Sequence, residues 1–352
     1  MVIAADKDKY LFFTDFHAHL FKDFAKPYQD ITDRFKQQLD ILDEMLSRAE
    51  KEDRIVIFGG DLFHQRQMVD QRVLNRVWQV FVNHISVPVI LLRGNHDSFN
   101  NSMTTVSSLD QFEALPNCHV VTKPEKLEVG AAIMYFMPYA EDIDYMKEVL
   151  NNFAEDAGKQ SKPCFEVAHL GIDGAQEGKS SHRLASAFSV DDMHPKAYKL
   201  VYLGHYHKRQ QLGTLGTMLY GGSTMQLTFS DEDETKGYDL VSADGVREFI
   251  KLNDQYPNFH SYETWTDEAQ QAIDRGDYVK LKLNKDAVKT YQQSGEAGQE
   301  NVRTEIKQEF KQETQLDLTA EDSPVTITQK YVKENCPEVT EEALEVIREV
   351  LN

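Results

Sequence analysis

Clusters of Asp, Asn and His recur in this sequence where apolar, strand-like runs end. Asp15 and His17 stand two residues apart in TDFHAHLF, Asp61 and His64 lie in GDLFH, and GNHD spans 94–97. The other members are three later histidines, His169, His205 and His207. Carboxylate, amide and imidazole groups are the ligands that divalent metals such as Mn²⁺, Fe²⁺ and Zn²⁺ take. The pattern predicts a metal centre.

Two cations about 3.5 to 4 Å apart can clamp a phosphate and activate a water molecule for an in-line displacement. Such a pair needs a bridging carboxylate, and Asp61 is the natural bridge because its strand should be central. His96 lies between Asn95, a plausible ligand, and Asp97, which could hold the imidazole in one tautomer. His96 is therefore a candidate to contact the phosphate and protonate the leaving oxygen.

The elements that must position these residues follow from apolar periodicity. Helical spacing predicts amphipathic helices over 31–52 and 69–83. Short apolar runs predict buried strands at 55–58, 87–92, 165–168, 200–203 and 218–220. This alternation predicts an α/β fold with a largely parallel sheet, in which ligands bind beyond the carboxyl ends of the strands. The chain must turn sharply where each strand ends, which glycine permits. This requirement accounts for the glycines that directly precede ligand candidates, namely Gly60, Gly94 and Gly204.

The character of the chain changes near residue 250. We expect a strand at 278–283 and a helix at 341–351. The stretch 292–315 is rich in Gln, Glu and Lys, and its pattern is consistent with an amphipathic helix or a mobile insertion. We therefore expect a first domain at 1–250, a smaller α+β domain at 251–335, and a C-terminal helical segment at 336–352.

Composition restricts the class of protein. With 352 residues and 41% hydrophobic content, the chain is large enough to form a hydrophobic core. It contains neither an apolar run long enough to span a bilayer nor a signal-peptide pattern. We therefore expect a cytoplasmic protein that makes no membrane contact. The three cysteines are widely spaced, which argues against disulfides and against a thiolate zinc site. A net charge of -20 disfavours non-specific duplex binding. It does not exclude a phosphodiester-cleaving enzyme whose metal ions supply local positive charge.

The ordered series DFH, GDLFH, GNHD, His169 and GHYH resembles the calcineurin-like metallophosphoesterase superfamily over about residues 10–250. The resemblance implies a four-layer αββα sandwich with two divalent metal ions. It assigns the first metal to Asp15, His17, Asp61 and His207, and the second to Asp61, Asn95, His169 and His205. His96 would be the general acid and Asp97 its orienting partner.

A narrower resemblance comes from residues 220–240, YGGSTMQLTFSDEDETKGYDL, and from YPNFHSYE followed by YVKLKL. Both are similar to the SbcD and MRN-complex nuclease subunits, including phage recombination nuclease subunits with a C-terminal capping domain. This implies a 3′-5′ exonuclease and single-strand endonuclease of a recombination and repair complex, located in the host cytoplasm if the protein is phage-encoded. Mn²⁺ is the expected metal, with Mg²⁺, Fe²⁺ or Zn²⁺ as alternatives.

The same resemblance implies DNA, an SbcC-type SMC-like ATPase and a second copy of the chain as partners. The dimer interface would fall on helices near 69–112, and His64 would help to place the DNA strand. Four cations close to the motifs are candidates for phosphate contacts, namely Arg66, Arg93, Lys208 and Arg209. Each could equally be an ordinary surface residue. The terminal helix either docks on the ATPase or packs on the smaller domain.

Three other functions stay open. The first is a phosphatase or small-molecule phosphodiesterase on the same fold, and the second is a non-catalytic scaffold. The third follows from the T-D-x-H-x-H run, which also resembles amidohydrolase and PHP-type metal sites, although those families would not explain GNHD and GHYH. His19 falls where the superfamily commonly has glycine, so we expect it behind the ligands or facing the substrate.

Overall fold

The computed structural model describes residues 2–4, 6–176, 187–295, 298–307, 322–335, 341 and 345–346. Residues 1–305 form one compact unit and residues 306–352 another. The described residues form two large β-sheets, a sheet of three strands and a sheet of two strands.

The first large sheet has the order β15-β14-β2-β5-β6-β7. Its four parallel strands are β2 (Lys9–Phe13), β5 (Ile55–Phe58), β6 (Val89–Leu92) and β7 (Cys118–Val121). Two antiparallel strands, β14 (Gly237–Ser242) and β15 (Arg247–Lys251), extend the edge beside β2. Strand β5, which leads to Asp61, lies between two parallel neighbours, as predicted.

The second large sheet has the order β1-β8-β9-β10-β11-β13-β12. Its parallel centre consists of β9 (Ala132–Met137), β10 (Cys164–His169), β11 (Leu200–Gly204) and β13 (Met218–Tyr220). The outer strands are β1 (Val2–Ile3), β8 (Glu125–Val129) and β12 (Gln210–Leu212). Antiparallel pairs join β8 to β9 and β12 to β13, so both sheets are mixed.

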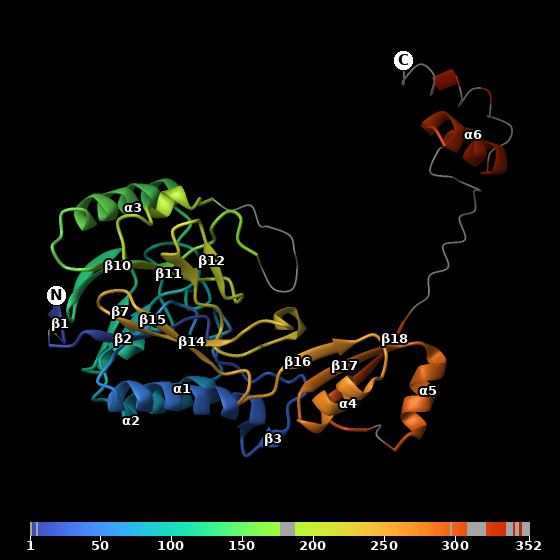
Figure 1. The fold of residues 1–352 in the computed structure, drawn as a ribbon, viewed down its shortest axis with the longest axis horizontal. Helices are drawn as coiled ribbons and strands as arrows, with labels where there is room; N and C mark the ends of the chain where they lie inside the picture. Colours follow the sequence, from blue (N-terminus) through green and yellow to red (C-terminus); the bar gives the residue numbers. More distant parts are fainter. Residues whose placement is uncertain are drawn as a thin grey trace. The chain divides into compact units, whose positions relative to one another are not determined.

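Helices cover the outer faces of both sheets (Figure 1), with α1 (Asp33–Lys51) and α2 (Gln71–Asn83) on the first and α3 (Ile143–Ala157) on the second. Alternate strand residues serve different cores, because successive side chains point to opposite faces. Leu11 packs toward α1 and α2, whereas Phe12 packs between the sheets. The result is the predicted four-layer αββα sandwich.

Helix α1 shows how the sequence sets these layers. The side chain of Thr32 caps its first turn by accepting a hydrogen bond from the Phe35 N–H. Its inward face includes Phe35, Leu42 and Leu46, which are fully buried. Each such side chain contributes roughly 1.5 to 3 kcal/mol by leaving water.

Short elements complete the first 250 residues. They are the hairpin strands β3 (Pro27–Tyr28) and β4 (Ile31–Thr32), and the 3₁₀ turns at Asp110–Ala114, Asp191–Met193 and Phe229–Asp231.

A small sheet of three strands follows, with β16 (Phe259–Tyr262), β17 (Tyr278–Leu283) and β18 (Val302–Ile306) in that order. Helices α4 (Asp267–Asp274) and α5 (Lys285–Gln293) supply part of a separate hydrophobic core. The expected helix or mobile insertion at 292–315 is wrong for 302–306, since β-branched Val302, Thr304 and Ile306 alternate there along a strand. The rest of that stretch from 308 onward lies outside the described residues.

The second unit contains α6 (Pro324–Asn335). Most of the helix expected at 341–351 lies outside the described residues. In the part of the chain that the structure describes, no helix has the length and apolar character needed to cross a bilayer.

Candidate metal centre

Seven predicted ligands converge at the carboxyl ends of five parallel strands. Asp15 and His17 follow β2, Asp61 follows β5, and Asn95 follows β6. The histidines come from the other sheet, with His169 ending β10 and His205 and His207 following β11. Main-chain hydrogen bonds tie the first two motifs together, because the N–H groups of Asp15 and His17 donate to the carbonyl oxygens of Gly60 and Asp61.

Asp61 lies between two groups of ligands. Its Oδ2 atom is 3.6 Å from Nε2 of His17 and 3.4 Å from Nε2 of His169. On the first side, Nε2 of His17 and Nε2 of His207 are 2.9 Å apart. Asp61 is therefore placed to bridge two cations.

The second group gathers around Asn95. Its Oδ1 atom lies 3.0 Å from Nε2 of His169 and 3.0 Å from Nδ1 of His205. The other ring nitrogen of His169, Nδ1, is 2.8 Å from the Gly59 carbonyl oxygen, which favours a proton on Nδ1 and a lone pair on Nε2. Tyr139 stacks on the His205 ring at 5.8 Å between centroids.

Backbone geometry at the centre explains the glycines. A Cβ atom at Gly94 would lie 2.1 Å from Oδ1 of Asp61, and Gly60 has φ +104°. Asp15, His17 and Asp61 themselves adopt positive φ angles of 50°, 49° and 63°. Strained backbone of this kind is typical of functional sites that the surrounding fold holds in place.

Burial controls the protonation of the ligands. It lowers the pKa of His17 well below the usual value, and together with His169 it lowers the pKa of His205 to about 4. Burial also lowers the pKa of His169, but Asp61 and Asp15 outweigh it and raise that pKa to about 9. His17 and His205 are therefore neutral near pH 7, whereas His169 would lose a proton on binding a cation. Asp15, His17 and His207 form one group with spacing suitable for a divalent cation, and Asp15, Asp61 and His169 form another.

The structure corrects the role expected for Asp97. Its carboxylate accepts main-chain hydrogen bonds from Asp61, Leu62 and Phe63 at 2.8, 2.9 and 3.2 Å. It accepts another from Gly94 at 3.0 Å. Asp97 therefore organises the ligand-bearing loops, and these bonds are not to the His96 ring.

The His96 ring is oriented by a different group. Its Nδ1 atom is 2.6 Å from the carbonyl oxygen of His64, and its main-chain N–H donates to Oδ1 of Asp61 at 2.8 Å. The rings of His64 and His96 stack at 5.8 Å, and the His19 ring lies 4.9 Å from that of His64. His19 thus lies behind His64 and outside the candidate metal groups of the described residues.

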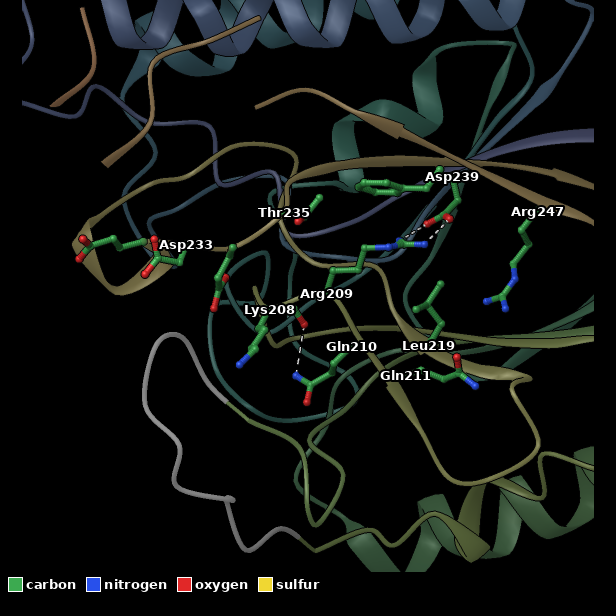
Figure 2. A pocket seen from close by; sticks show the side chains of 12 residues that line it. Lys208, Arg209, Gln210, Gln211, Leu219, Asp233, Thr235, Asp239 and Arg247 are labelled. Carbon is green, nitrogen blue, oxygen red and sulfur yellow. Dashed lines mark hydrogen bonds and ion pairs between the residues drawn. The ribbon is translucent and has the colours of Figure 1, made fainter. Parts of the chain in front are cut away.

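Two of the four predicted DNA-binding cations are engaged inside the protein. Arg93 is fully buried and donates to the carbonyl oxygens of Met103 and Tyr139. Arg209 forms two bonds of 2.6 and 2.7 Å to the buried Asp239 (Figure 2), and its guanidinium lies 3.9 Å from the Phe249 ring centroid. The prediction for Arg93 is wrong, because its side chain has no exposed surface. The side chain of Arg209 is 19% exposed and lines the pocket in Figure 2, so its DNA contact stays a prediction.

The other two cations keep polar contacts near the surface. Arg66 donates to the side chain of Asn101, and Nζ of Lys208 is 2.9 Å from Oε1 of Gln176. Lys208 and Arg247 both line a pocket of about 750 Å³; Figure 2 shows Lys208 on the side of Asp233 and Arg247 on the opposite side, near Asp239.

Sequence reasoning missed two residues beside the ligands. Tyr139 follows β9, so the rule that identified the other strand ends would have found it. Asp231 lies in the acidic stretch used for the narrower resemblance, and its Oδ1 atom is 3.7 Å from Nδ1 of His207.

Comparison with known proteins adds independent findings. Two curated relatives are SbcD subunits of the nuclease SbcCD, one from Staphylococcus saprophyticus, 22% identical over 225 residues, and one from Staphylococcus epidermidis, 21% identical over 220. These matches cover 58% and 57% of this chain, and the chain spans only 60% and 59% of the relatives' lengths.

Among solved structures, a dimetal phosphatase from Danio rerio is 10% identical with a TM-score of 0.41, over 67% of this chain and 92% of that one. The sequence model for calcineurin-like phosphoesterases matches residues 9–209, more than half of the 352 residues. The chain therefore belongs to the calcineurin-like phosphoesterase family.

Proposed function

We propose that this phosphoesterase is a metal-dependent DNA nuclease subunit, acting as a 3′-5′ exonuclease and single-strand endonuclease with an SMC-like ATPase of the SbcC type. The observation that carries the chemistry is the Asp61 carboxylate between His17 on one side and His169 on the other, with the main-chain N–H of His96 donating to it. The choice of DNA as substrate is supported by the two relatives named as nuclease subunits.

The ligand assignment in this proposal has two parts that share Asp61. One cation would be held by Asp15, His17, Asp61 and His207, and the other by Asp61, Asn95, His169 and His205. Mn²⁺ suits this donor set, as do Fe²⁺, Zn²⁺ and Mg²⁺. When bound, such a pair clamps the phosphate and neutralises charge that develops during displacement.

Side chains of the protein supply the proton and position the reacting groups. His96 presents Nε2 to the leaving oxygen, because Nδ1 is engaged by the carbonyl oxygen of His64 at 2.6 Å. Nε2 then donates a proton to the departing oxygen, as a general acid does. Asp97 holds the loops that carry Asp61 and Asn95, and the ring of His64 would place the DNA strand.

We assign residues 251–335 to a capping domain that follows the nuclease domain at 1–250 in the chain. Its support is the docking of the small sheet around Arg34 of α1, whose guanidinium lies 5.1 Å from the Phe259 ring and 5.2 Å from the Tyr278 ring. Residues 336–352 are proposed as the segment that meets the ATPase.

A homodimer through 69–112 belongs to the same proposal. Its support is exposed apolar surface in that region, where Phe99 and Val106 are 50% and 66% exposed.

The deciding experiment is degradation of a 3′-labelled linear duplex in Mn²⁺ by the wild type and by Asp61→Asn, with a phosphomonoester as a second substrate. We expect metal-dependent digestion by the wild type and none by the variant, because a neutral amide cannot bridge two cations. Intact DNA together with cleavage of the monoester would reject the nuclease and keep the metal centre.

That second result would favour a phosphatase or small-molecule phosphodiesterase. The net charge of -20 and the internal bonding of Arg93 and Arg209 are the observations on its side. A small phosphodiester would be cleaved in either case, so it reports only that the centre is active.

A further inference from the structure

The 3₁₀ turn at Phe229–Asp231 and the loop after it lie against the ligand candidate His207. The Nε2 atom of His207 points to His17, whereas Nδ1 faces Asp231, with 3.7 Å to Oδ1. This distance is too long for a hydrogen bond, but it allows the carboxylate to attract an N–H group on Nδ1.

Asp231 is itself firmly fixed. It is 1% exposed, and its Oδ2 atom accepts main-chain hydrogen bonds from Leu227 and Thr228, each 3.0 Å long. Its Oδ1 atom, which faces the histidine, is 2.9 Å from Nζ of Lys236. The carboxylate is therefore held on both sides by the loop that carries it.

Lys236 holds the main chain of the same histidine. Its ammonium group, on a side chain 1% exposed, donates to the carbonyl oxygen of His207 at 2.8 Å, to Asp231, and to Oε2 of Glu234 at 2.7 Å. All three ammonium protons are thus used. Lys236 fixes the backbone of His207 and the carboxylate that faces its ring.

The approach of this loop needs a glycine nearby. The Ser223 N–H donates to the His207 carbonyl oxygen at 3.1 Å. Gly222 has φ +74°, and a Cβ atom there would lie 2.7 Å from that same oxygen. The turn of GGST therefore allows both the main chain and Lys236 to reach His207.

We propose that Asp231, anchored by Lys236, is a positioning residue for His207 that keeps the proton on Nδ1 and the lone pair on Nε2. It would thereby set the affinity for the cation that Asp15, His17 and His207 hold. This inference rests on the metal-dependent function proposed above. Carboxylates that face the distal nitrogen of a metal-binding histidine typically contribute 10- to 100-fold to metal affinity.

The first test is a Mn²⁺ titration of the metal-free protein by calorimetry, as a double-mutant cycle. Asp231→Asn keeps the volume but turns an amide NH₂ group toward the ring or the lysine. We expect one of the two Mn²⁺ affinities to fall about 10- to 100-fold and the other to change less than threefold.

The cycle separates positioning from a general loss of structure. In a His207→Asn background, adding Asp231→Asn should change the affinity less than threefold, because Asp231 acts through that ring. Asp233→Asn is the matched control, since it removes an exposed carboxylate from the same loop, and both affinities should stay within twofold of the wild type. Unchanged affinities in Asp231→Asn, or an equal loss in the His207→Asn background, would overturn the proposal.

The second test reads the tautomer in the wild type and needs His207→Asn only to assign the signal. Long-range ¹H–¹⁵N spectra of the Zn²⁺-loaded protein should show His207, assigned by the signal lost in His207→Asn, with its proton on Nδ1. A proton on Nε2, or a wild type that takes up no metal, would refute the inference. Neither test uses DNA, so a wild type that binds two Mn²⁺ ions without cutting DNA would reject the nuclease function alone.

Discussion

His96→Ala tests whether His96 acts in acid catalysis and not in metal binding. The His96 side chain is absent from the proposed ligand sets, and its main-chain N–H, which donates to Asp61 at 2.8 Å, survives the substitution. Metal content should therefore stay at the wild-type value while hydrolysis of DNA collapses. General acid catalysis contributes roughly 10²- to 10⁴-fold, which corresponds to about 3 to 5 kcal/mol of transition-state stabilisation.

The leaving group makes this prediction specific. A deoxyribose alkoxide needs a proton as it departs, whereas 4-nitrophenolate is stable without one. The variant should therefore lose about 10²- to 10⁴-fold on DNA and less than tenfold on bis(4-nitrophenyl) phosphate. The assay compares kcat/KM on both substrates, with Mn²⁺ content measured on the same samples.

His64→Ala tests DNA placement separately, because it is the main-chain carbonyl of His64 that contacts Nδ1 of His96. That carbonyl remains in the variant, so cleavage of the nitrophenyl ester should persist while DNA degradation falls. An equal loss by His96→Ala on both substrates, or the disappearance of a metal ion, would refute the assignment of His96 as the acid.

Three other perturbations test the rest of the structure. Glu166 is buried without a hydrogen-bond partner for either carboxylate oxygen among the described residues, and burial raises its pKa well above 4.5. The folded state then holds the proton more tightly, so wild-type stability should fall as pH rises above about 4.5 until the folded pKa is reached, by up to about 1.4 kcal/mol per unit. Glu166→Gln should reduce this decline in urea unfolding between pH 6 and 9, and parallel curves would contradict it. Gly94→Ala should displace the Asp61 carboxylate and release metal, whereas Gly158→Ala, where the nearest atom is 3.6 Å from the new Cβ, should bind metal normally. Removal of metal with EDTA should stop hydrolysis and lower Tm, because a metal ion that binds only the folded protein stabilises it against unfolding. An unchanged Tm would show that metal binding does not stabilise the fold.

The individual helices and strands could be predicted because they depend on local signals, whereas the four layers are implied only by the family resemblance. Periodicity alone predicts a single, largely parallel sheet, and the structure has two mixed sheets. The expected helix over 31–52 is α1 at Asp33–Lys51, and the apolar run at 55–58 is β5. Parallel strands bring their carboxyl ends to one edge of a sheet, so ligands that follow β2, β5 and β6 are expected to meet. Their meeting with His169, His205 and His207 also needs the packing of the second sheet on the first.

The directions of individual side chains could not be predicted in this way. Arg93 precedes GNHD in sequence, yet it turns inward because the carbonyl oxygens of Met103 and Tyr139 offer it partners. Asp97 turns away from its neighbour His96 because main-chain N–H groups of another loop converge on it. In both cases the decisive partners come from segments that only the tertiary fold brings close.

These contacts also bear on how an acidic protein could hold a polyanion. Since Arg93 and Arg209 are engaged internally, they add little to the positive potential that an incoming phosphate would meet. Without metal, the buried carboxylates of Asp15 and Asp61 would repel phosphate, and two divalent cations bound by the proposed ligands would reverse the sign of the local charge. Loading with metal would therefore create the phosphate site and the catalytic site in one step. The net charge of -20 would then discourage contacts elsewhere on the surface.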